Sequence, residues 1–147
     1  MEIYADLPGH NINGGTIPQD IIQTALRPDL ILIERKEQRI QILELTCSFE
    51  TNIEAAYHRK YKNYTDLKLD LEKAGWKVNL YPFEVGSRGH VTKRNKNTIM
   101  KTAKLINNNI KHRNLISELS KISLLCSFSV YQAHSQPTWQ SPPFLHP

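Results

Sequence analysis

DLILIERKEQRIQILELT, residues 29–46, contains two runs of apolar and β-branched residues separated by a short polar segment. The first run, residues 30–34, and the second, residues 39–46, have the length and composition of β-strands. The polar residues between them are of hairpin-loop length, with the turn centred between Lys36 and Glu37. The stretch therefore predicts an antiparallel hairpin.

This register brings two acidic residues together at the open end of the hairpin. Glu34 would face Arg39, and Asp29 would face Glu44, with Cβ atoms about 4.5–5.5 Å apart on one face of the sheet. Thr46 lies two residues beyond Glu44, on the same face. Adjacent carboxylates repel each other unless a cation lies between them, and carboxylate oxygens suit hard divalent ions such as Mg²⁺ or Mn²⁺. A one-residue slip of the register, or a Glu44 side chain that faces solvent, would remove this candidate metal site.

A long helix is expected to follow the hairpin. A capping box at Thr51 opens it, and Gly75 ends it after Ala74 as a residue of left-handed conformation. Lys60 occupies a position in the apolar stripe of this helix, which otherwise contains Ile53, Tyr57, Tyr64, Leu67, Leu71 and Ala74. Its stem can lie along its apolar neighbours while the ammonium group reaches the two carboxylates. The alternative is that Lys60 turns outward to solvent.

Two carboxylates, a divalent cation and a lysine together suit phosphodiester hydrolysis. Asp29 and Glu44 would hold the metal, which lowers the pKa of a bound water. Lys60 would orient that water or stabilise negative charge on the phosphoryl oxygens, with Thr46 in the adjacent position. Lys62 leaves the helix on another face and is a candidate for contacting backbone phosphates.

The remaining elements complete the expected fold. A hairpin, a crossover helix and a strand that returns in parallel predict an α/β fold with a mixed central sheet and flanking helices. The other expected elements are a strand over residues 2–7, a short helix from an N-cap at Thr16 to about Ala25, a strand over Trp76–Val85, a tight loop over Gly86–Gly89, and helices over residues 93–110 and 114–132.

Basic residues are concentrated in one segment of the chain. The sequence has 19 basic and 14 acidic residues, a formal net charge of +5. Eight of the bases and no acidic residue lie between Glu84 and Glu118, so the remaining 11 bases meet all 14 acids. Such a field favours a polyanion such as nucleic acid, although a solvated helix face would carry the same pattern. The candidate contacts in this segment are Arg88, Lys93, Arg94 and Lys96.

The length of 147 residues suits one compact domain, expected over residues 2–133 and followed by a flexible proline-rich tail over 134–147. Cys47 and Cys126 are far apart in sequence and form no disulfide framework, so a reducing intracellular setting is expected. In a eukaryote the expected compartment is the nucleus. The sequence has no apolar segment of signal-peptide or membrane-spanning length, so no membrane association is expected.

Several blocks of the sequence resemble a known family. Together they are similar to the restriction-like PD-(D/E)xK endonuclease fold, and more narrowly to the versions at the C-terminal end of reverse-transcriptase-bearing retroelements. The similarity covers roughly residues 2–95. The blocks that carry it are Asp6–Gly9, Gly14–Pro18, Arg27-Pro28-Asp29, Glu44-Leu45-Thr46, the helix from Ile53 through Lys60 to Tyr64, and Glu84–Gly89.

This resemblance implies Mg²⁺-dependent cleavage of DNA, with Asp29 and Glu44 as the metal ligands. Thr46 stands where many members carry a lysine. In relatives that lack that lysine a helix lysine serves instead, and Lys60 matches its place. The expected partner is DNA, with an RNA–DNA hybrid as a further candidate. Two alternatives stay open: a nucleic-acid-binding module of the same fold without catalysis, and a structural remnant of it.

Overall fold

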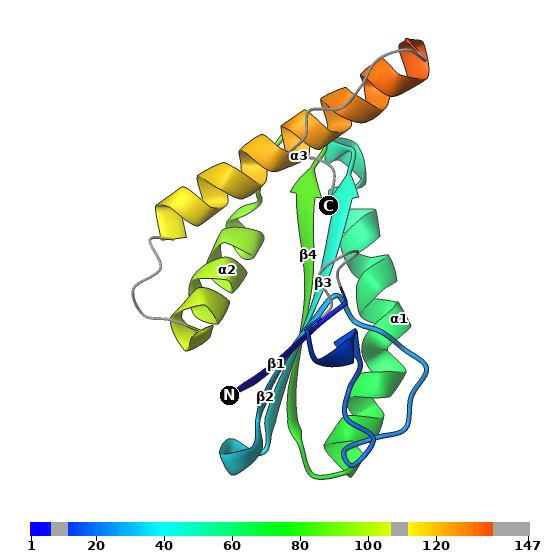
Figure 1. The fold of residues 1–147 in the computed structure, drawn as a ribbon, viewed down its shortest axis with the longest axis vertical. Coiled ribbons are helices and arrows are strands. Elements are labelled where there is room, and N and C mark those ends of the chain that lie inside the picture. The colour runs from blue at the N-terminus through cyan, green and yellow to red at the C-terminus, as the bar shows by residue number, and fades with distance from the viewer. Residues whose placement is uncertain (7–11, 107–111, 137–147) are drawn as a thin grey trace. The chain divides into compact units, whose positions relative to one another are not determined.

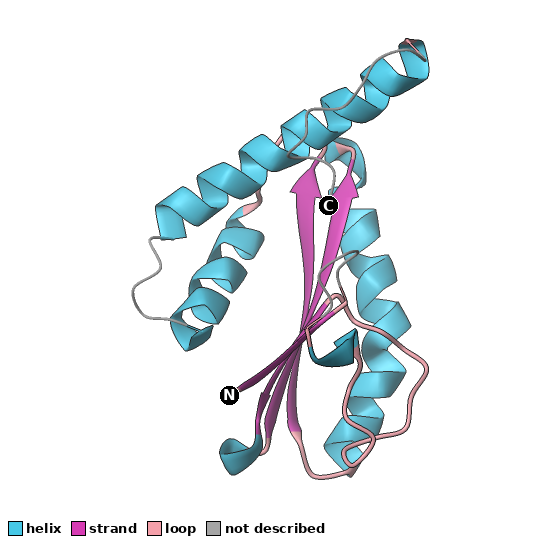
Figure 2. Cartoon of the chain, viewed as in Figure 1, coloured by secondary structure: helices cyan, strands magenta, loops and turns pink. Residues whose placement is uncertain are grey.

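The computed structural model describes residues 1–6, 12–106 and 112–136 (Figure 1). Four strands and three α-helices form a mixed α/β fold, with short 3₁₀ turns between them (Figure 2). The strands are β1 (Glu2–Ala5), β2 (Leu30–Glu34), β3 (Arg39–Ser48) and β4 (Lys77–Gly86), and the helices are α1 (Ile53–Lys73), α2 (Lys93–Ile106) and α3 (His112–Ser135). None of the described helices is both long and apolar enough to cross a membrane.

Residue contacts divide the chain into two compact units. The first unit contains Met1–Leu45 and Ala55–Phe83, and the second contains Thr46–Glu54 and Glu84–Pro147. The first unit holds most of the sheet and nearly all of α1, whereas the second holds the ends of β3 and β4, the start of α1, and helices α2 and α3. This division does not test the expectation of one domain over residues 2–133, which therefore stays a prediction.

The predicted hairpin register is confirmed. β2 and β3 pair antiparallel, with Glu34 opposite Arg39 and Leu30 opposite Leu43. The 3₁₀ turn between the strands ends at Gln38, whose φ of 47° places it in the left-handed region. The sheet order is β1-β2-β3-β4, so β4 is an edge strand, which accommodates Pro82.

The core of the first unit lies between the sheet and α1. Alternate residues of the hairpin point to this side, because side chains along a strand alternate between faces. Tyr64, Leu67 and Leu71 of α1 pack against them, and Ile17 covers part of the same cluster. The hairpin and β4 contribute Ile31, Ile33, Ile40, Ile42, Val78 and Leu80. This face also carries the predicted acidic pair at the end of the hairpin.

The expected helix over residues 16–25 is wrong. Pro18 accepts hydrogen bonds from the N–H groups of Ile21 and Ile22, which makes a single turn, and the segment continues as loop. A helix this short gains too few hydrogen bonds to offset the cost of nucleation. Ile17 is buried and Ile21 and Ile22 are half-buried against the core, so apolar packing determines the path of the chain here.

The boundaries of other elements differ by a few residues from those expected. Thr51 is not the N-cap of a continuous helix, because Glu50–Asn52 form a 3₁₀ turn and α1 begins at Ile53. Gly75 ends α1 as predicted, with a φ of 91°. α3 extends to Ser135, so the first residues of the expected tail are helical. Residues 137–147, the last residue of the expected strand over residues 2–7, and the end of the expected helix over residues 93–110 lie outside the described residues.

The second unit is held together by the loop that follows β4. Ser123 of α3 donates a hydrogen bond to the Gly86 carbonyl (2.8 Å), and Ser120 donates to the Gly89 carbonyl. A Cβ atom on Gly89 would lie only 2.6 Å from the Ser120 carbonyl oxygen, and its φ of +83° also favours glycine. The tight loop predicted over Gly86–Gly89 is therefore confirmed, and the glycine permits its close contact with α3.

Candidate metal and nucleic-acid site

Each of the two predicted carboxylates accepts a hydrogen bond from a backbone N–H group at or beside the other residue. Asp29 directly precedes β2, and Glu44 lies on β3. Glu44 Oε1 accepts a hydrogen bond from the backbone N–H of Asp29 (3.0 Å), and Asp29 Oδ2 accepts one from the backbone N–H of Leu45 (2.7 Å). The reciprocal bonds hold both acidic groups at the open end of the hairpin, as the register predicts.

Lys60 reaches this acidic pair from α1. Its Nζ atom lies 2.8 Å from Glu44 Oε2. The Glu44 side chain is only 1% exposed, and the Lys60 side chain is 26% exposed. A buried carboxylate is costly without a counter-charge, and the lysine supplies one. Lys60 therefore faces the sheet, and the alternative in which it turns outward to solvent does not occur.

Tyr64, which the apolar stripe of α1 predicts only as a core residue, also lies beside the acidic pair and Lys60. Its hydroxyl group donates a hydrogen bond to the Arg27 carbonyl at 3.5 Å. Burial raises the pKa of Tyr64 well above its usual range, and the negative charges of the neighbouring Glu44 and Asp29 carboxylates raise it further. The hydroxyl group thus stays protonated and faces the acidic pair. The signal was present in the sequence, because Tyr64 lies four residues after Lys60 on one helix face.

The donor set fits a hard divalent cation in chemical type. Asp29 uses one carboxylate oxygen in a hydrogen bond, and its other oxygen has no partner among the described residues. Each Glu44 oxygen accepts one hydrogen bond and keeps a second lone pair. No group of three or more His, Cys, Asp or Glu residues suited to a metal occurs in the described part of the chain. Mg²⁺ commonly binds through one or two carboxylates together with waters and substrate phosphates, so a pair of carboxylates is compatible with it in number.

The other two residues predicted near this site are placed as follows. Thr46 follows Glu44 along β3 but belongs to the second unit, and its buried hydroxyl oxygen has no hydrogen-bond partner among the described residues. Lys62 is exposed on α1, two residues after Lys60. The structure therefore brings together Asp29, Glu44 and Lys60, and leaves Lys62 free to contact solvent.

The four predicted basic contacts of the second unit have different surroundings. Arg88 pairs with Glu50 at 3.0 Å, and Arg94 pairs with Glu54 at 3.2 Å. Lys93 and Lys96 are exposed on the first turn of α2 and form no ion pair with another described residue. Lys93 and Lys96 are thus unpaired among the described residues, whereas Arg88 and Arg94 each have a carboxylate partner.

Glu84 is a buried acidic residue that no sequence signal assigned a role. Its side chain is fully buried, with Arg94 Nη2 at 3.5 Å and Asn95 Nδ2 at 3.4 Å from Oε2. Asn95 also donates to the Glu84 backbone carbonyl. Burial raises the pKa of Glu84, and the neighbouring Asn95 and Arg94 oppose this only in part. Arg94 therefore has an internal electrostatic role in the second unit.

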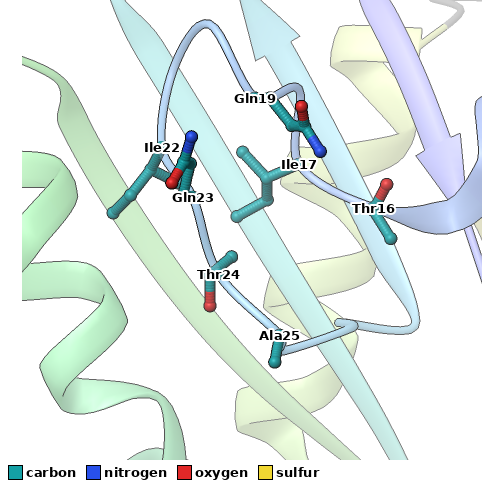
Figure 3. A pocket seen from close by; sticks show the side chains of 7 residues that line it. All are labelled: Thr16, Ile17, Gln19, Ile22, Gln23, Thr24 and Ala25. Atoms are coloured by element: carbon teal, nitrogen blue, oxygen red, sulfur yellow. The ribbon is translucent and has the colours of Figure 1, made fainter.

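The first unit also contains a hollow of about 540 Å³, and its lining differs in composition from the charged groups described above. It is lined by seven side chains of the 16–25 segment, including Ile17, Gln19 and Gln23 (Figure 3). The lining contains hydroxyl, amide and aliphatic groups but no ionisable side chain. This hollow has no group suited to acid–base or metal chemistry, so we assign no chemical role to it.

The chain matches no protein-family model, no curated protein and no solved structure.

Proposed function

We propose that this protein is a metal-dependent nuclease that hydrolyses phosphodiester bonds in DNA, of the restriction-like type found in retroelement proteins. The observation that carries the proposal is the convergence of Asp29, Glu44 and Lys60, which are distant in sequence. Two carboxylates fixed by backbone hydrogen bonds and one lysine form a small, pre-organised polar cluster. Such a cluster suits a cation and a phosphate group together.

In this proposal Asp29 and Glu44 hold Mg²⁺ or Mn²⁺. When bound, the cation would lower the pKa of a water and neutralise charge on the phosphate. The ammonium group of Lys60 would donate to a non-bridging phosphoryl oxygen or orient the attacking water. Tyr64, which stays protonated, would add no further negative charge to the site. Lys60 would thus take the role of the lysine that many members of the resembled family carry at the position of Thr46.

Nicking of supercoiled plasmid by the full chain in the presence of Mg²⁺ tests the proposal. Asp29→Asn and Glu44→Gln should each lower the rate by about 100-fold or more, because they weaken the hold on the cation that activates the water. Asp66→Asn and Glu37→Gln are matched controls, because both side chains are exposed. Wild-type protein that does not nick DNA, or variants as active as the controls, would contradict the proposal.

Metal binding provides a readout that does not depend on cleavage. Electron paramagnetic resonance of added Mn²⁺ should detect one bound ion per wild-type chain and a loss of that ion in Asp29→Asn. Unchanged Mn²⁺ binding in this variant would mean that Asp29 is not a ligand. The Asp66→Asn control should bind Mn²⁺ as the wild type does.

A second candidate function is nucleic-acid binding without catalysis. The observation that favours it is the direct contact of Lys60 with Glu44, which neutralises the buried carboxylate without any metal. In that case binding would weaken as salt rises, and it would be indifferent both to EDTA and to Asp29→Asn. The two candidates differ in one result, since only the nuclease requires a divalent cation for its activity.

A further inference from the structure

The second unit contains a hollow of about 520 Å³ whose polar lining is basic. The loop after β4 contributes Arg88 and His90, the first turn of α2 contributes Lys96, and α3 contributes Lys121 together with the hydroxyl groups of Ser117 and Ser120. None of its lining residues is acidic. Lys96 and Lys121 are exposed and form no ion pair with any described residue.

Arg88 is held in a defined position at this hollow. Its backbone N–H donates to Glu50 Oε1 (2.8 Å) and its Nε donates to Oε2 (3.0 Å). The guanidinium carbon also lies 5.3 Å from the centre of the Phe49 ring. These contacts leave the two terminal nitrogens of the guanidinium group without a partner among the described residues. A fixed guanidinium group with free terminal donors is suited to the oxygens of a phosphate.

The loop that carries Arg88 is also held against α3. Gly86 donates its N–H to the His90 carbonyl (2.7 Å), and Gly89 donates to the Gly86 carbonyl (2.8 Å). The hydroxyl group of Ser120 donates to the Gly89 carbonyl. Because the loop and α3 are joined by these bonds, Arg88 and Lys121 are brought to the same hollow before any ligand arrives.

We propose that this hollow is a nucleotide-phosphate site. The basic groups and serine hydroxyl groups would bind the phosphate oxygens, and the apolar part of the wall, Val91, Ile116 and Leu124, would lie against the sugar or base. The phosphate site stands on its own geometry, whereas its assignment to a DNA strand rests on the proposed nuclease function. The phosphate belongs either to a strand end or to the backbone within a strand, since both present the same oxygens.

Fluorescence anisotropy with the full chain in EDTA tests this site without any cleavage. The probes are a labelled single-stranded oligonucleotide with a 5′-phosphate and the same oligonucleotide with a 5′-hydroxyl group. Lys121→Gln should weaken binding about 5- to 10-fold, because a charge-assisted contact to phosphate is lost. Lys104→Gln, on an exposed position of α2 outside the hollow, is the matched control and should change affinity by less than about 2-fold.

The two probes separate the two sources of the phosphate. Tighter binding of the 5′-phosphate probe that Lys121→Gln abolishes would assign the site to a strand end. Equal binding of both probes, with equal loss in Lys121→Gln, would assign it to the backbone. Equal effects of Lys121→Gln and Lys104→Gln, or no binding by the wild type, would overturn the proposal. The EDTA in this assay separates binding from cleavage. A chain that binds through this hollow in EDTA but does not nick plasmid in the presence of Mg²⁺ would contradict only the nuclease function.

Discussion

At the level of single residues, Lys60 both stabilises the fold and carries the proposed chemistry. Glu44 is almost fully buried and has two partners, the backbone N–H of Asp29 and the ammonium group of Lys60. Lys60→Met keeps the apolar stem but leaves the carboxylate with one donor. We expect the free energy of unfolding to fall by about 1–3 kcal/mol, less than for a fully buried ion pair, because Lys60 is partly exposed. Urea denaturation followed by circular dichroism measures the change.

Two further variants test the cause of that loss. Lys62→Met removes an exposed lysine from the same helix and should change the free energy of unfolding by less than about 0.5 kcal/mol. The double variant Lys60→Met/Glu44→Gln should recover part of the loss, since the uncompensated charge is gone. If the double variant is less stable than Lys60→Met alone, the charge on Glu44 is not what makes the single change costly.

Glu84 gives a pH-dependent prediction. Burial raises the pKa of Glu84 above its ordinary value of 4.5, so the folded state holds this proton more tightly than the unfolded state. Its contribution to stability is therefore complete below pH 4.5 and is lost as the pH rises through the raised pKa. Relative to the wild type, Glu84→Gln should become progressively more stable as the pH rises from 4 to 7. Urea denaturation across that range measures this, with Glu37→Gln to correct for the loss of a surface charge.

A constant stability difference between Glu84→Gln and the wild type across this range would contradict the prediction. It would mean that Asn95 and Arg94 compensate the buried carboxylate fully. The sign of the effect does not depend on the absolute cost of the substitution, because a lost hydrogen bond shifts the curve by the same amount at every pH.

At the level of elements, the end of α1 depends on Gly75. This residue has a φ of +91°, and a Cβ atom there would contact nothing within 4 Å. The penalty of Gly75→Ala is therefore purely conformational, and we expect the free energy of unfolding to fall by about 1 kcal/mol. Gly75→Asn should cost less, because asparagine tolerates the left-handed region. Equal losses for alanine and asparagine would show that backbone conformation is not the cause.

The hairpin and Lys60 are predictable from sequence because their causes are local. The alternation of apolar residues, the short polar turn and the helical stripe each restrict the structure within about 20 residues. The helix expected over residues 16–25 fails because Ile17, Ile21 and Ile22 gain more from packing on the sheet than a short helix provides. The Glu84–Asn95 contact joins β4 to the start of α2, and the hollow beside Lys121 joins the loop after β4 to α3. No periodic pattern in the sequence indicates either pairing.

At the level of the whole molecule, the uneven charge predicts salt-sensitive binding, but not every base contributes to it. Lys93 and Arg94 are neighbours on α2 with the same formal charge. Lys93 is exposed, whereas Arg94 is directed to Glu54 and Glu84. If about four or five phosphates are contacted, affinity for DNA in EDTA should fall by about two to three orders of magnitude as salt rises fourfold.

The matched variants Lys93→Gln and Arg94→Gln separate the contribution of a basic residue to DNA binding from its contribution to folding stability. Lys93→Gln should reduce the slope of log affinity against log salt by about 0.9 and leave the free energy of unfolding unchanged. Arg94→Gln should lower the free energy of unfolding and leave the salt slope unchanged. Its loss leaves the buried Glu84 carboxylate with less compensating positive charge and removes no phosphate contact. If Arg94→Gln lowers the salt slope as much as Lys93→Gln does, Arg94 contacts the polyanion directly. The basic segment would then act as a uniform patch, and the distinction between binding and structural bases made from the ion pairs would be wrong.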